Sequence, residues 1–196
     1  MAETILAGIV SFVGTNIDDI FINTLFFAQA DTKRKVKATI IGVYLGIGTL
    51  VLLSMLGAYF LQAVPQKYIG LLGFIPIILG IKAWAEYIQE KKNSNADESV
   101  ENPGASKGLL WSVMLITISN GADNIGVYIP LFASYTAMQL LTVAIVFAWM
   151  TALWCVLGKK LSDLPGLRKI LLKYKHIIVP VVFIALGIYI ILKSNL

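Results

Sequence analysis

Apolar residues dominate the chain in long stretches that are separated by short polar or basic connections. A helix needs about 20 mostly apolar residues to cross the hydrocarbon core of a bilayer. Stretches of suitable length lie at residues 4–29, 38–63, 68–88, 109–134, 139–158 and 176–193. Because lipid cannot satisfy bare backbone amide and carbonyl groups, each stretch is predicted to be helical. The pattern therefore predicts an all-α polytopic membrane protein with six transmembrane helices.

The composition also favours a membrane protein. Of the 196 residues, 58% are hydrophobic and 14% are charged, whereas a soluble domain averages about 45–50% apolar and about 25% charged residues. The net charge is +5, but the basic residues lie mainly in the connections between the apolar stretches. We therefore interpret this charge as a topology signal, and we expect the lipid bilayer as a partner and no nucleic acid.

Most of the 16 Lys and Arg residues fall in three connections, at 30–37, 89–108 and 159–175. In a chain of six transmembrane helices these three connections lie on the same side of the membrane. Cytoplasmic connections carry an excess of Lys and Arg. The distribution therefore predicts that the three connections are cytoplasmic and that both termini are extracytoplasmic.

The two halves of the chain resemble each other. The first apolar stretch contains Thr15-Asn16-Ile17-Asp18-Asp19-Ile20, and the fourth contains Asn120-Gly121-Ala122-Asp123-Asn124-Ile125. A shift of 105 residues places Asp18 on Asp123. Because each half has an odd number of helices, the second half would enter from the opposite side, which makes an inverted repeat. Transporters built in this way bind their substrate near the midplane, at the interface between the repeats.

A polar segment at 93–106 contains proline and glycine, which is typical of a linker. We therefore predict three parts. These are a first three-helix repeat at 1–92, a cytoplasmic linker at 93–108 and a second three-helix repeat at 109–196.

The aspartates of the two motifs are predicted to lie near the centre of the bilayer. About ten residues flank the first motif on each side, and at about 1.5 Å per residue each flank covers roughly 15 Å. A carboxylate at the centre costs about 2.5–3.5 kcal/mol, so three would cost roughly 8–10 kcal/mol. A cation, water, protonation or mutual hydrogen bonding must offset this cost.

Helical spacing groups the polar residues of each motif into one arc, because successive residues are about 100° apart. If the two arcs face each other, they form a pocket of carboxylate and amide oxygens, which suit a divalent cation. The predicted ligands are Asn16, Asp18, Asp19, Asn120, Asp123 and Asn124. Asp18 and Asp19 both contribute only if the helix is distorted there. Interhelical hydrogen bonding is the alternative role for Thr15, Asn16 and Asn120.

Other motifs bear on the helices. Pro130 would release the backbone carbonyl four residues before it, just beyond Asn124, as a further oxygen for a metal. Gly42-x-x-x-Gly46 permits close helix packing, either inside the chain or in a homo-oligomer. Cys155 lies away from the midplane, so we expect it to pack in the core.

At the two polar motifs the sequence resembles the cadmium-resistance transporter family (CadD type) of the lysine-exporter superfamily. The matching residues are Thr15–Phe21 and Ser119–Ile125, and the resemblance covers nearly the whole chain. It implies export of cadmium, together with other divalent metals, through a bacterial plasma membrane, with the acids of the motifs as metal ligands. The oxygen donors themselves suit harder cations, so manganese, calcium and zinc also remain open.

The sequence favours a secondary transporter over an enzyme. It contains no phosphate-binding loop, so proton exchange is the expected driving force. A protonated carboxylate is the favoured state in lipid, and a metal can replace the proton. We expect no cofactor, because the metal is cargo. The alternatives are an exporter of amino acids or other organic cations and an intramembrane aspartyl hydrolase, in which two aspartates share a proton.

Overall fold

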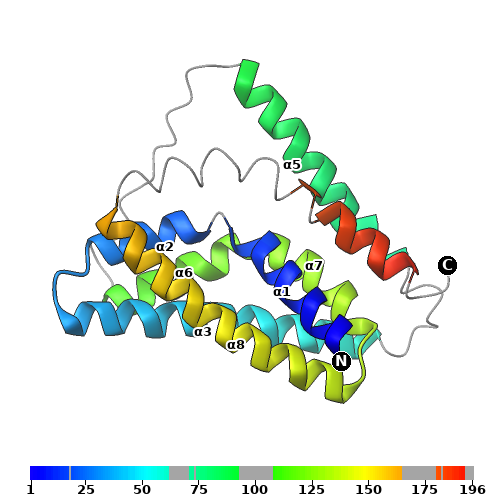
Figure 1. Cartoon of the computed structure of the whole chain (residues 1–196), viewed down its shortest axis with the longest axis horizontal. Coiled ribbons are helices and arrows are strands. Elements are labelled where there is room, and N and C mark those ends of the chain that lie inside the picture. Colours follow the sequence, from blue (N-terminus) through cyan, green and yellow to red (C-terminus); the bar gives the residue numbers. More distant parts are fainter. Residues whose placement is uncertain are drawn as a thin grey trace.

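The structure is a computed structural model that describes residues 1–17, 19–61, 71–72, 74–92, 108–164, 180–181 and 183–192. Its helices, labelled as in Figure 1, are α1 (Ala2–Asn16), α2 (Asp19–Ala28), α3 (Lys33–Leu61), α5 (Phe74–Lys92), α6 (Leu109–Asn120), α7 (Ala122–Ala133) and α8 (Ala137–Asp163). A further apolar helix spans Phe183–Leu192. Within the described residues every regular element is helical, which confirms the predicted all-α class.

Two of the described helices are long and apolar enough to cross a bilayer: α3, with 29 residues, and α8, with 27 residues. A third span results if α1 and α2, which meet at an angle of 65°, are counted together. The α6 helix and the Phe183–Leu192 helix are apolar but shorter. The described part is therefore consistent with a membrane protein, and the count of six spans stays a prediction. The predicted linker at 93–108 lies outside the described residues, apart from Gly108.

The first and fourth apolar stretches are each divided into two helices, although the apolar pattern alone indicates continuous ones. The first is interrupted between Asn16 and Asp19, and the fourth is interrupted at Gly121. Asn and Asp are poor helix formers because their side chains compete for backbone hydrogen bonds, and glycine leaves the backbone with excess freedom. The polar motifs therefore also mark the helix breaks.

Each long helix packs against the broken pair of the other half. As Figure 1 shows, α3 lies along α6 and α7, whereas α8 lies along α1 and α2. Aromatic rings fill the space between α1, α7 and α8. The ring centroid of Phe147 lies 5.3 Å from that of Phe12 and 4.8 Å from that of Tyr128. Phe12 also packs edge-on against Trp154, with centroids 5.4 Å apart.

The α5 helix and the Phe183–Leu192 helix lie side by side at one edge of the molecule (Figure 1). A Cβ atom at Gly80 would lie 2.9 Å from the carbonyl oxygen of Pro180, so glycine permits this close approach. The α5 helix reaches the rest of the bundle through α7, where Leu79 packs against Gly126.

Glycine also lets α3 approach α6. A Cβ atom at Gly42 would lie 2.7 Å from the carbonyl oxygen of Leu110, and one at Gly46 would lie 2.6 Å from the Cβ atom of Thr117. Both separations are shorter than such atoms tolerate. The Gly42-x-x-x-Gly46 motif therefore serves a contact inside the chain, which is one of the two uses that the sequence leaves open.

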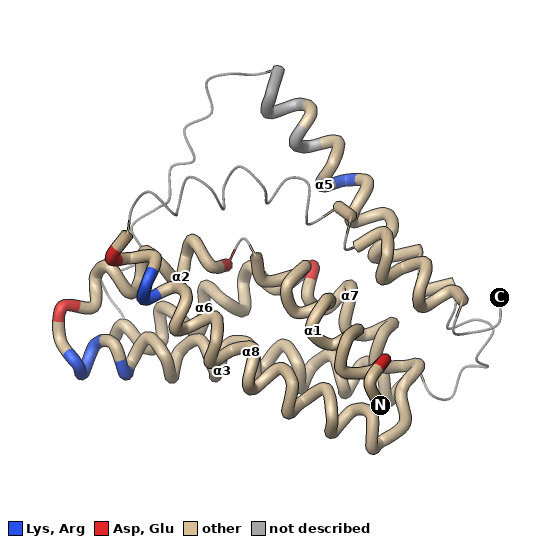
Figure 2. Tube along the Cα trace, in the orientation of Figure 1, with Lys and Arg blue, Asp and Glu red and all other residues tan. Residues whose placement is uncertain are grey.

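Positive charge gathers at the end of the bundle where α3 begins and α8 ends, as Figure 2 shows. The residues are Lys33, Arg34, Lys35 and Lys37 on α3, and Lys159 and Lys160 on α8. Exposed ion pairs join Lys35 to Asp31 at 2.9 Å and Lys159 to Asp163 at 3.2 Å. The described parts of two basic connections therefore share one end of the molecule, in agreement with the charge pattern.

Gly46→Ala is expected to destabilise the protein by about 1–3 kcal/mol, because the added methyl group overpacks the contact between α3 and α6. The matched control is Gly48→Ala on the same helix, where nothing lies within 4 Å of the added atom. There the helix propensity of alanine is expected to raise stability by up to about 1 kcal/mol or to leave it unchanged. Thermal unfolding of both variants in detergent measures the difference. Equal melting temperatures would contradict the close packing.

Candidate functional site

The predicted ligands lie at the two helix breaks. They occupy the end of α1 (Asn16), the start of α2 (Asp19), the end of α6 (Asn120) and the first turn of α7 (Asp123 and Asn124). The sixth, Asp18, lies outside the described residues. Asn16 and Asn124 are fully buried, whereas Asn120 is exposed. The site therefore extends from the interior of the bundle to a more open side.

The hydroxyl group of Tyr128 is the centre of a buried hydrogen-bond network. The side-chain amides of Asn16 and Asn124 donate to it at 2.9 and 3.1 Å, and it lies 2.7 Å from the hydroxyl oxygen of Thr15. The Asn124 amide also donates to Oδ1 of Asn16 at 3.3 Å. Direct bonds between the two motifs therefore join α1 to α7.

Trp154 connects the end of α1 to α8. Its indole N–H donates to the backbone carbonyl oxygen of Asn16 at 2.7 Å. The last carbonyls of a helix lack partners within that helix, so this bond satisfies a group that the break leaves bare.

Trp154 is absent from the predicted functional residues, because nothing in the fifth apolar stretch distinguishes it from a packing residue. Tyr128 is also absent from the predicted ligands. Helical spacing nevertheless places it in the same polar arc as Asn120, Asp123 and Asn124, because it lies four residues after Asn124.

The two described carboxylates of the site each lie in the first turn of a helix. Oδ1 of Asp123 accepts a hydrogen bond from the backbone N–H of Asn124 at 2.9 Å. Oδ1 of Asp19 accepts one from the side-chain amide of Asn120 at 3.4 Å, which links the two breaks directly. The first turn is the positive end of the helix dipole and stabilises negative charge.

One oxygen of the site, Oδ1 of Asn124, is buried and has no hydrogen-bond partner in the described part of the chain. Leaving such an acceptor unsatisfied costs about 1–3 kcal/mol. A cation beside this oxygen would satisfy it. With the carboxylates of Asp19 and Asp123, the site offers the kind of oxygen donors that bind divalent cations.

Three further features bear on the donors that the site could offer. Among the described residues no group of three or more His, Cys, Asp and Glu side chains could hold a metal ion. Cys155 is buried in the hydrophobic core. Pro130 lies inside α7. The break falls instead at Gly121, where a Cβ atom would collide with the side chain of Leu50.

These features are consistent with an α-helical membrane protein in which two broken helices carry polar side chains into an apolar bundle. Membrane transporters commonly bind their substrates at such breaks. The chain belongs to the cadmium resistance transporter family, because the model of this family matches residues 12–196. No curated protein and no solved structure matches it.

The family match confirms the resemblance that the two motifs indicate. It covers both motifs and everything after the first turns of α1. The family is one of transporters and not of enzymes. Placement in the lysine-exporter superfamily stays a prediction.

Tyr128→Phe is expected to lower stability by about 0.6–2 kcal/mol, because the hydroxyl group that joins α1 to α7 is lost. The matched control is Tyr59→Phe, whose side chain is exposed on α3, and it is expected to change stability little. Thermal unfolding in the same detergent compares them. A Tyr128→Phe variant as stable as the control would show that the network contributes nothing to folding.

Proposed function

We propose that this protein is a secondary transporter that exports divalent metal cations, cadmium foremost, through the polar site at its two helix breaks. The observation that carries the proposal is the contact between the two motifs. The side-chain amide of Asn120 donates a hydrogen bond to Asp19, although the two residues are 101 positions apart in the sequence. Carboxylates and amides that lie together at the edge of an apolar bundle, beside the buried Asn16 and Asn124, suit binding of a cation.

The proposed ligands are the six predicted residues, Asn16, Asp18, Asp19, Asn120, Asp123 and Asn124. The carboxylates offset the charge of the metal, and the amide oxygens complete its coordination. The donors are hard oxygens, which by themselves also suit manganese, calcium or zinc. Cadmium is placed first because of the family to which the chain belongs.

In this proposal the chain consists of two inverted repeats, 1–92 and 109–196, joined by a cytoplasmic linker at 93–108. Movement of one repeat relative to the other produces transport. The packing supports this arrangement, since each long helix lies against the broken pair of the other half. Rocking of one repeat against the other would expose the site to each side in turn. In this proposal the chain crosses a bacterial plasma membrane six times, with both termini extracytoplasmic.

Proton exchange is the proposed driving force. An ionised carboxylate away from water is costly, so a carboxyl group that loses its metal regains stability by taking up a proton. Asp19 is buried, with 7% of the residue exposed, so this cost applies to it. Release of metal on one side and of protons on the other would then complete the cycle.

Asp18→Asn, Asp19→Asn and Asp123→Asn are each expected to reduce cadmium export about tenfold or more, because ligand loss costs at least as much as loss of an outer-shell partner. The control is Glu3→Gln, an exposed carboxylate at the start of α1. Cell cadmium content and growth on cadmium, zinc, manganese and cobalt provide the measurement, at matched membrane levels of protein. Wild type that changes no metal, or three variants that all export normally, would refute the metal site and favour an exporter of organic cations.

Proton coupling predicts a direction of flux. In proteoliposomes that are acidic inside, protons leave down their gradient, so cadmium is expected to enter faster than without the pH gradient and to accumulate inside above its outside concentration. A metal-sensitive dye inside the vesicles reports the entry, and a protonophore is expected to abolish it. Asp123→Asn vesicles give the background rate. Cadmium entry that is indifferent to the pH gradient would remove proton coupling while leaving export itself intact.

A further inference from the structure

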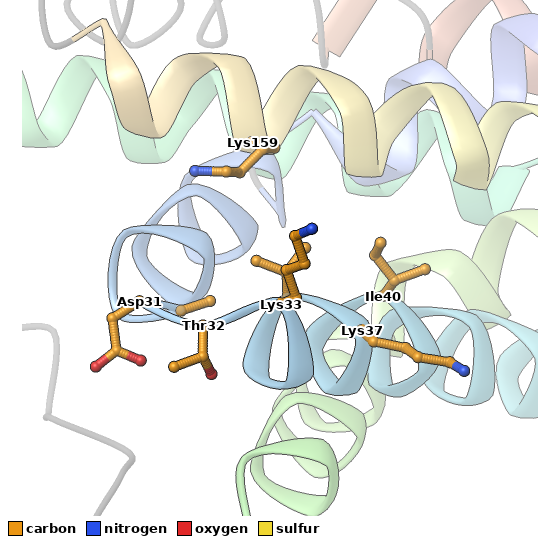
Figure 3. A pocket seen from close by; sticks show the side chains of 8 residues that line it. Asp31, Thr32, Lys33, Lys37, Ile40 and Lys159 are labelled. Atoms are coloured by element: carbon orange, nitrogen blue, oxygen red, sulfur yellow. The ribbon is translucent and has the colours of Figure 1, made fainter.

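A hollow of about 400 Å³ lies at the basic end of the molecule, away from the polar site. It is bounded by the connection between α2 and α3, by the first two turns of α3, and by the end of α8. Figure 3 shows Lys33 rising from α3 toward α8, where Lys159 lies across the same gap. Lys37, one turn after Lys33, also lines it.

The hollow carries excess positive charge. Lys33 and Lys37 have no ion-pair partner among the described residues. The one carboxylate in the lining, Asp31, is engaged by Lys35 at 2.9 Å. The hydrogen bond from Lys35 lowers the pKa of Asp31 below its ordinary value, so this acid is ionised and already matched by a cation. Lys159 is paired with Asp163 at 3.2 Å, outside the lining. An anion that enters the hollow therefore meets the unpaired Lys33 and Lys37 and no unmatched carboxylate of the lining.

The hollow also has an apolar side. Val36 and Ile40 line it and share one face of α3 with Lys33 and Lys37, because these positions are three to four residues apart. The same face continues to Tyr44, whose hydroxyl donates to the carbonyl oxygen of Ala148 on α8 at 2.9 Å. The hollow therefore has lysines on one side and an apolar surface on the other. This surface, formed by Val36, Ile40 and Tyr44 where α3 faces α8, is the apolar seam.

We propose that this hollow binds the phosphate head group of an anionic membrane lipid, with an acyl chain along the apolar seam. Basic pockets between transmembrane helices are suited to anionic head groups. A free phosphate ion would use the lysines but would leave Val36 and Ile40 without a partner. The lipid matches both the basic side and the apolar side of the hollow. It would also bridge α3, in the first half of the chain, and α8, in the second half.

The test uses the purified full chain and native mass spectrometry, with titrations of phosphatidylglycerol and of phosphatidylcholine that carries the same acyl chains. The pocket variant is Lys33→Gln with Lys159→Gln. The matched control is Arg34→Gln with Lys160→Gln, which removes the same charge from neighbouring exposed residues outside the hollow. We expect the pocket variant to bind phosphatidylglycerol about thirtyfold more weakly than wild type does, and the control to stay within about twofold.

Three results would overturn the proposal. Equal losses in the pocket variant and the control would indicate diffuse attraction rather than a site. Equal binding of the two lipids by wild type would remove the role of head-group charge. A separate titration with inorganic phosphate completes the test, because free phosphate that binds wild type as tightly as the lipid does would assign the hollow to a soluble anion.

Discussion

A polar group inside a bundle of apolar helices must find its partner within the protein, and the broken helices of this chain follow from that requirement. Each break leaves backbone groups without their helical bonds. At the end of α1 the carbonyl of Asn16 is satisfied by the indole of Trp154. At the start of α7 the N–H of Asn124 is satisfied by Asp123. Side chains satisfy the backbone groups that the breaks leave bare. At the end of α1 this side chain is Trp154, which comes from the other half of the chain.

The close approach of α3 to α6 depends on the absence of side chains at its contact points. Gly42 and Gly46 let α3 lie against α6, and Gly121 lets Leu50 of α3 pack directly onto the second break. Van der Waals packing of this kind drives helix association in membranes, where burial of apolar surface gives little advantage. The small residues therefore fix the position of α6, and through it the position of the ligands at its end.

The sequence predicts part of this arrangement. The apolar stretches at 38–63 and 139–158 correspond to α3 and α8, because a long run of apolar residues is sufficient to indicate a helix. The meeting of the two motifs also follows from helical spacing and from the cost of polar groups in lipid. The bend of 65° between α1 and α2 cannot be predicted from the sequence, because an apolar pattern carries no signal for the angle at which two helices meet. The role of Trp154 is unpredictable for a related reason, because hydropathy does not indicate which helix of one half faces the other half.

The setting of Trp154 has an optical consequence. The chain has four tryptophans, and the other three, Trp84, Trp111 and Trp149, are between 46% and 76% exposed. Trp154 is 6% exposed and hydrogen-bonded at the first helix break. Lipids with brominated acyl chains quench the fluorescence of indoles that they touch. The emission that survives such quenching is therefore expected to be enriched in the signal of Trp154, which gives the native protein a spectroscopic reporter of the place where its first helix is interrupted.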